Sequence, residues 1–123
     1  MSPELLTYIN DVLTQNGINY EFMRWTSDIV YPYFVGEFIE PEPQSEDGGH
    51  DATFLLTGHT RGSYLELIEI KDKIEQLFDQ TKAILPNGNG VAFLYGGSTP
   101  VPTLDAELKR IEINLIIKEW KVK

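Results

Sequence analysis

The residues of this sequence best suited to chemistry are its two histidines, His50 and His59. His50 lies in the segment Glu46-Asp-Gly-Gly-His-Asp51, where carboxylates and an imidazole could together ligate a metal ion. The spacing matches neither a calcium-binding loop nor a pair of histidines on one helix. Glycines and carboxylates in this arrangement are more typical of a solvated turn, so we expect no metal site here.

His59 lies in Thr57-Gly-His-Thr-Arg-Gly62, where a strand is expected to lead into a helix. A histidine that acts as a general base needs a nucleophile or substrate and a partner that orients its ring. Hydroxyl side chains are near in sequence, but no recognised serine or threonine motif surrounds them. The pattern favours a hydrogen-bonded histidine with a structural role, and we expect no catalytic residues and no enzyme activity.

A phosphate-binding loop needs glycines at fixed spacing and a lysine before a serine or threonine. Gly58, Gly62, Gly96 and Gly97 do not have that spacing. Arg61 does precede the start of a predicted helix, where an anion could bind. One arginine without a fingerprint is weak support, so we expect no bound cofactor.

Acidic side chains dominate the first half of the chain. The formal net charge is −9, and the first 62 residues carry ten acidic and two basic side chains. Such a chain repels phosphates on average, so we expect no sequence-specific binding of nucleic acid. Six acids and no bases lie between residues 37 and 51, which indicates a repulsive or partner-seeking loop. Its candidate contact residues are Glu40, Glu42, Glu46 and Asp47.

Length and composition fit one folded domain of 123 residues. Cysteine is absent, so the chain has no disulfide and no zinc-thiolate site. No apolar run approaches the roughly 18 residues that a membrane span requires, so we expect no membrane association. The N-terminus lacks a basic segment followed by an apolar stretch, and we expect no signal peptide.

Periodicity predicts an α+β domain, with an antiparallel sheet of about four strands packed by two helices. One helix is expected from Pro3 to the Asn16-Gly17 stop signal, and a second opens at Ser63, where Glu66 has capping-box spacing. The predicted element order is α-β-β-α-β-β, with strands at 31–40, 52–60, 91–95 and 108–122. A mobile hairpin tip is expected at 41–51, and another loop at 96–103.

The last predicted strand alternates clearly, with apolar residues on one face and a mostly polar opposite face. The apolar set is Ile111, Ile113, Leu115 and Ile117. Beyond Lys118 the apolar side chains change faces, because Trp120 and Val122 share the polar face. Either a bulge restores the phase, or Trp120 and Val122 pack against another molecule. The second alternative makes these two residues candidates for a subunit interface.

Several segments, taken in order, resemble small proteins of tailed-bacteriophage and prophage tails, similar to tail-terminator or tail-completion proteins. They are Tyr33-Phe-Val-Gly-Glu-Phe38, residues 54–66, the helix ending Ile74-Glu-Gln-Leu-Phe78, and Leu108-Lys-Arg-Ile-Glu-Ile-Asn-Leu115. The resemblance implies an α+β subunit of a hexameric ring that contacts tail-tube and head-completion proteins. It also implies a place in the virion tail, with assembly in the host cytoplasm, and it transfers no catalytic residues.

Two other functions remain open from the sequence alone. The chain could be an acidic module that binds a basic partner through the 41–51 segment. It could also be a small metal-binding protein or enzyme centred on His50 or His59. Self-association distinguishes the structural subunit from both alternatives.

Overall fold

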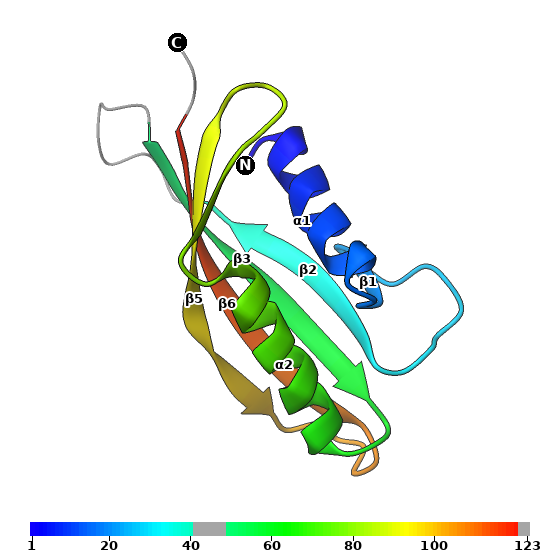
Figure 1. Cartoon of the computed structure of the whole chain (residues 1–123). Coiled ribbons are helices and arrows are strands. Elements are labelled where there is room, and N and C mark those ends of the chain that lie inside the picture. The colour runs from blue at the N-terminus through cyan, green and yellow to red at the C-terminus, as the bar shows by residue number, and fades with distance from the viewer. Residues whose placement is uncertain (41–48, 121–123) are drawn as a thin grey trace.

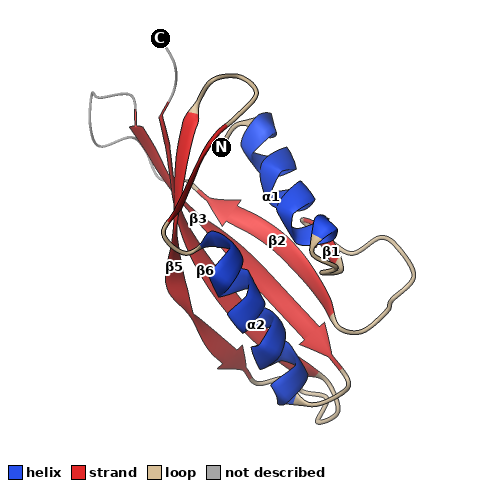
Figure 2. Cartoon of the chain, viewed as in Figure 1, coloured by secondary structure: helices blue, strands red, loops and turns tan. Residues whose placement is uncertain are grey.

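Two helices lie on one face of a six-stranded, twisted sheet (Figure 1). The structure is a computed structural model that describes residues 1–40 and 49–120. Figure 2 shows both helices on the same side of the strands, so the sheet has a covered inner face and an opposite outer face. Among the described residues, no helix is long and apolar enough to cross a membrane.

The elements follow one another in the order α-β-β-β-α-β-β-β. They are α1 (Pro3–Gln15), β1 (Tyr20–Phe22), β2 (Tyr33–Ile39), β3 (Gly49–Thr60), α2 (Tyr64–Phe78), β4 (Thr81–Ile84), β5 (Gly90–Val101) and β6 (Lys109–Trp120). The predicted α+β class with two helices is confirmed. The predicted number of about four strands was wrong, because β1 and β4 are too short to show an alternating pattern.

The strand order across the sheet is β1-β2-β3-β6-β5-β4. All neighbouring strands are antiparallel except β1 and β2, which are parallel. The prediction of a purely antiparallel sheet was therefore also wrong. The last strand of the series, β6, lies in the middle of the sheet between β3 and β5.

Helix α1 begins and ends as the sequence predicts. The hydroxyl oxygen of Ser2 accepts a hydrogen bond from the Leu5 backbone N–H at 3.2 Å, and Pro3 occupies the first turn. Gly17 follows the helix with a φ of 77°, a left-handed conformation that suits glycine. The buried stripe of α1 consists of Leu5, Ile9 and Leu13.

Helix α2 begins where the sequence predicts, with Ser63 at its N-cap, but it lacks the predicted capping bonds. Ser63 makes no side-chain capping bond, so the predicted capping box is absent. The Glu66 carboxylate instead accepts a hydrogen bond from the Thr60 hydroxyl at 3.4 Å. Leu67, Ile74 and Phe78 are buried on the covered side of the helix, whereas Tyr64 and Ile68 are exposed.

Strand β5 is longer than predicted, because residues 96–101 belong to it rather than to a loop. The register against β6 shifts between Tyr95 and Ser98 and then continues to Val101, which is typical of a bulge. Strand β4 pairs with β5 only as far as Phe93. Beyond Phe93, no described strand pairs with the edge of β5 that faces away from β6. Pro100, which has no N–H to donate, is therefore tolerated in this part of the strand.

The inner face of the sheet forms the core with the buried stripes of both helices. Ile111, Ile113, Leu115 and Ile117 are all buried there, as the alternation predicts. Gly58, opposite Phe34 in the register, lies beneath the Phe34 ring, and a Cβ at this position would overlap the ring. The glycine next to His59 is thus required by close packing.

The predicted hairpin tip at 41–51 extends too far, because its last three residues belong to β3. Strand β3 begins at Gly49, and its register with β6 includes Asp51. Residues 41–48 lie outside the described residues.

Candidate functional site

The outer face of the sheet carries exposed apolar side chains that no described helix covers. One row of residues runs across four strands in register, from Ile39 through Thr53 and Ile116 to Leu94. Ile39 is 67% exposed, Leu94 50% and Ile116 46%. Large apolar side chains that share one row of an open sheet face mark a candidate contact surface.

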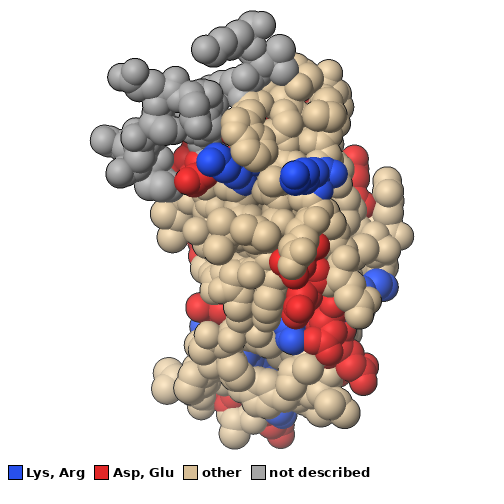
Figure 3. All heavy atoms as spheres, turned by 60° about the vertical axis from the view of Figure 1, so that its left-hand side comes forward, with Lys and Arg blue, Asp and Glu red and all other residues tan. Residues whose placement is uncertain are grey.

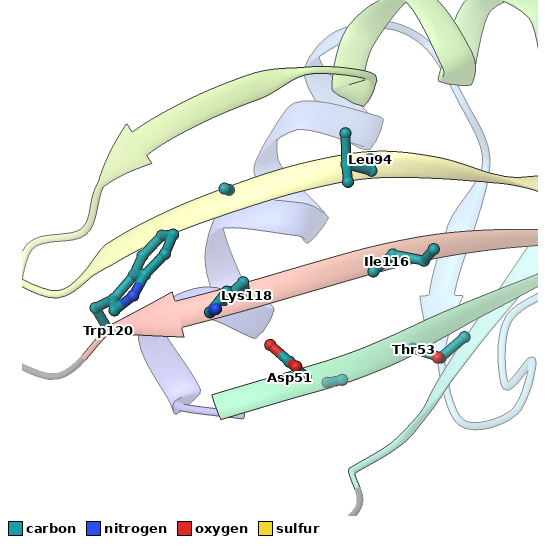
Figure 4. Close-up of a pocket in the computed structure, with 8 residues that line it drawn as sticks. Asp51, Thr53, Leu94, Ile116, Lys118 and Trp120 are labelled. Atoms are coloured by element: carbon teal, nitrogen blue, oxygen red, sulfur yellow. The ribbon is translucent and has the colours of Figure 1, made fainter. Parts of the chain in front are cut away.

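A hollow of about 360 Å³ lies on this face, along β3, β6 and β5. Figure 4 shows Leu94 and Ile116 on neighbouring strands, with Trp120 at the far end of β6 and Lys118 between Ile116 and Trp120. Apolar atoms make up most of its surface. We name the row Ile39, Thr53, Ile116 and Leu94, together with Trp120, the outer apolar surface.

Trp120 lies on the outer face, as the interface alternative predicts. The register between β3 and β6 is unbroken from Thr60 opposite Lys109 to Gly49 opposite Trp120, so no bulge returns Trp120 to the core. Its side chain is 38% exposed and lies next to Gly90 of β5. Lys118 reaches over the indole ring, 5.6 Å from its centroid. The change of face predicted at the end of β6 is therefore present in the structure, and it leaves Trp120 partly exposed on the outer face.

Charged side chains of both signs border the outer apolar surface, with exposed Glu37 of β2 in the next row on one side and two lysines on the other. Lys118 of β6 and Lys82 of β4 lie in the next row along the strands, together with Asp51 and Ala92. Within the described residues, neither lysine takes part in an ion pair. Figure 3 shows basic side chains set in a mainly uncharged surface, with acidic side chains in a band beside it.

The acidic residues predicted as contacts are only partly described. Glu40 is exposed and forms an ion pair with the amino group of Met1. Glu42, Glu46, Asp47 and Val122 lie outside the described residues. The structure therefore brings Trp120 into the candidate surface and does not test the acidic set as a group.

His59 has a hydrogen-bonded and stacked environment. Arg110 donates from Nε to His59 Nε2 at 3.2 Å, and the Tyr33 ring stacks on the imidazole with centroids 4.8 Å apart. Burial, aided by the positive charge of Arg110, lowers the pKa of His59. The Nε2 lone pair is occupied by Arg110, and Nδ1 is buried without a hydrogen-bond partner.

The other candidate residues are occupied by neighbours or give no metal site. Arg61 forms an ion pair with Asp105 at 3.0 Å, and a Cβ on Gly62 would meet the Glu66 carboxylate. The chain's own acids thus occupy the start of α2, where an anion could have bound. Within the described residues, no group of three or more metal-ligating side chains is present. His50 lies in β3, but its side chain is outside the described part of the structure.

One polar group that the sequence did not single out is Glu119, which is 4% exposed on the covered face. The Ser2 hydroxyl donates to its carboxylate at 2.6 Å, and the Asn89 amide donates at 2.9 Å. Burial disfavours the charged carboxylate, but the hydrogen bonds from Ser2 and Asn89 outweigh it and lower the pKa of Glu119. The signal in the sequence is a charge at an inward position of an otherwise apolar alternation.

Comparison with known proteins adds information on the fold. The sequence matches no protein-family model and no curated protein. Solved structures do share its architecture. One of them, whose name describes no function, aligns over 100% of this chain and 99% of its own, with a TM-score of 0.67 and 11% sequence identity. The likeness is of fold alone.

Proposed function

We propose that this protein is a structural subunit of a phage or prophage tail, similar to tail-terminator proteins. In this proposal, copies of the chain associate into a ring that caps the tail tube and joins it to the head. Support comes from the sequence segments that resemble this family and from the surface of the sheet. The partners are further copies of the chain, tail-tube proteins and head-completion proteins.

The observation that carries the proposal is the outer apolar surface. Ile39, Leu94 and Ile116 are each close to half exposed or more, and Trp120 stands at one end of them. Aromatic residues are enriched at protein interfaces, and tryptophan is frequent among the residues that dominate binding energy. A contact with another copy would remove these side chains from water. Burial of apolar surface stabilises a contact by roughly 25 cal/mol for each Å².

The net charge agrees with a ring through which DNA passes. The chain carries −9, and a protein that binds DNA tightly neutralises phosphates with lysine and arginine. An acidic subunit would let DNA slide without holding it. This point supports the proposal but does not carry it, because acidity also promotes solubility.

Sedimentation velocity over a concentration series tests self-association. We expect the wild-type protein to form a closed oligomer, and the variant Leu94→Asp with Ile116→Thr to sediment as a folded monomer. Threonine keeps the β-branched shape that suits a strand. Leu104→Asp is the matched control, because Leu104 is fully exposed in the loop before β6. A wild-type protein that stays monomeric throughout would contradict the proposal.

The neighbouring genes test the place in the tail separately. We expect genes for major tail and tape-measure proteins beside this one. A gene position among unrelated metabolic functions would argue against a tail protein, even if the chain forms oligomers.

The second candidate function is an acidic module that binds a basic partner. The excess of acids in the first 62 residues favours it. This function predicts a monomer that binds a lysine-rich peptide, with an affinity that falls as salt is added.

A further inference from the structure

A row of aromatic and basic side chains crosses the sheet at the end where β3 finishes and β6 begins (Figure 1). Tyr33 of β2, His59 of β3 and Arg110 of β6 are direct neighbours in the register. Arg110 precedes the buried Ile111, so this row lies on the outer face. Trp25, from the loop after β1, lies against the Tyr33 ring with centroids 5.0 Å apart. Tyr33, His59, Arg110 and Trp25 are all half-buried, and we name them the His59–Arg110 site.

The two arginines at this end of the sheet differ in how their charges are used. Arg61 pairs with Asp105 at 3.0 Å and donates from Nε to the Tyr31 hydroxyl at 3.3 Å. Arg110 donates from Nε to His59 Nε2 at 3.2 Å, and within the described residues it forms no ion pair. A guanidinium has five N–H donors. Among the same described residues, the four N–H donors on the two Nη atoms of Arg110 have no acceptor.

His59 holds the Arg110 guanidinium in one orientation. His59 Nε2 accepts a hydrogen bond, so the imidazole is neutral and carries its proton on Nδ1. Burial first, and then the positive charge of Arg110, lowers the pKa of His59, which keeps the ring neutral at neutral pH. The Tyr33 ring stacks on the imidazole with centroids 4.8 Å apart. Because Nε is occupied, the edge of Arg110 that remains is its pair of Nη atoms, a fork that can donate to both oxygens of a carboxylate.

We propose that the His59–Arg110 site binds the carboxylate of an aspartate or glutamate side chain of a partner protein. The two Nη groups of Arg110 donate to the two carboxylate oxygens, and the rings of Trp25 and Tyr33 contact the atoms next to the carboxylate. His59 does not touch the ligand and acts as a positioning residue. This inference goes beyond the proposed function and does not require the chain to self-associate.

The charge of the site favours a carboxylate over a phosphate. Burial raises the pKa of the Tyr33 hydroxyl, so this group stays neutral, and Arg110 is the cation of the site. Glu112 lies in the next row of β6 on the same face, and within the described residues it forms no ion pair. One cation with a carboxylate nearby suits a ligand with one negative charge better than a phosphate group, which carries about two.

The position of the site favours a protein ligand. Small molecules bind mainly in enclosed clefts and cavities, whereas the His59–Arg110 site lies on the open face of the sheet. Arginine and aromatic residues are also enriched at protein interfaces and among the residues that dominate binding energy. A half-buried arginine held in place loses less side-chain entropy on binding than a mobile one.

Titration of the full ¹⁵N-labelled chain with a blocked peptide of alternating glycine and glutamate, followed by NMR, tests the site. We expect the Nε–H signal of Arg110 and the backbone signals of Tyr33 and His59 to shift as the peptide is added. The same peptide with glutamine in place of glutamate should cause no shift. Arg110→Gln should weaken the binding at least about tenfold. Lys82→Gln should leave it unchanged, because it removes an exposed lysine at the other end of the outer face.

Two substitutions of His59 test its positioning role. The side-chain oxygen of glutamine can accept the Arg110 N–H in place of the imidazole, whereas leucine cannot. We therefore expect His59→Gln to keep most of the affinity for the glutamate peptide and His59→Leu to lose most of it. Circular dichroism and thermal unfolding establish that both variants fold. Equal affinities of His59→Leu and the wild type would overturn the role of His59.

The remaining outcomes decide the site without reference to His59. Absence of a shift at Arg110 with the glutamate peptide would overturn the inference. Equal losses of affinity in Arg110→Gln and Lys82→Gln would overturn it as well, because binding would then reflect general attraction between charges. Inorganic phosphate that binds at Arg110 more tightly than the peptide would show that the class of ligand is wrong. None of these results depends on the oligomeric state, so a failure here leaves the proposed ring to its own test.

Discussion

The two faces of the sheet are built by alternate residues of the same strands, yet they have different environments. On β6, Leu115 is fully buried against the helices, while the adjacent Ile116 is 46% exposed on the outer face. Both are aliphatic residues of similar size in the middle of the same strand. The comparison shows that an apolar side chain on a strand does not by itself indicate a core position. Isoleucine on the outer face needs another explanation, and a contact with a further molecule provides one.

The largest expected effect on folding comes from substituting these two neighbours separately. Leu115→Ala should lower the free energy of unfolding by about 2–5 kcal/mol, because it leaves a cavity in the core. Ile116→Ala should lower it by less than about 1 kcal/mol, because the side chain is partly in water. Urea denaturation at low protein concentration measures both values. Equal losses would show that the two faces do not differ in the monomer.

Glu119 extends the comparison of the two faces, because it is a buried charged residue among the apolar residues of the covered face. Glu119→Gln should cost about 1–3 kcal/mol at neutral pH, because hydrogen bonds to a buried charge are weakened. The pKa of Glu119 is lower in the folded protein than its ordinary value of 4.5. Its contribution is therefore complete above about pH 4.5 and is lost as the pH falls through the lowered value.

Unfolding by urea at several pH values measures this dependence. We expect a shallower fall in stability below pH 4.5 for Glu119→Gln than for the wild type. Glu107→Gln is the matched control, because Glu107 lies in an exposed loop. Parallel curves for wild type and Glu119→Gln would show that this carboxylate does not contribute through its charge.

Trp120→Ala should have a small effect on the fold and a clear effect on assembly. The indole is partly exposed beside Gly90, so we expect a loss of no more than about 1 kcal/mol in the free energy of unfolding. Association should weaken more, since tryptophan often anchors interfaces. Thermal unfolding and sedimentation, compared with Leu115→Ala, separate the two effects. A large loss of stability with unchanged association would refute a role for Trp120 in the interface.

Much of the fold could be predicted from local patterns. The capping residue Ser2 and the alternation of Ile111 to Ile117 fixed α1 and β6, because caps and periodicity depend on neighbouring residues. Strand β4 has only four residues, and the second half of β5 contains two glycines and a proline. These segments are strands because β5 and β6 supply partners for them, and that pairing is not local. Their strand structure could not be inferred from their own residues.

Of the residues of the outer apolar surface, the sequence pointed only to Trp120, at the end of β6. Trp120 stood out because it breaks the alternation of β6. Ile116 lies on the face that the sequence describes as mostly polar, and its neighbours Ile39 and Leu94 come from strands far away in sequence. Only the register across β2, β3, β6 and β5 brings these three residues into one row. The signal for this surface in the sequence was Ile116, a single isoleucine on the mostly polar face of β6.

The central position of β6 has a consequence for the order of events during synthesis. Strands β3 and β5 are made first, and each has β6 as its neighbour in the finished sheet. Until residues 109–120 leave the ribosome, β3 and β5 have no common partner, and the edges that face each other stay open. Contacts between residues far apart in sequence form slowly, and unpaired edges favour aggregation. The nascent chain therefore completes its sheet only after its last strand is released, and a pause in translation before residue 109 would prolong its most aggregation-prone state.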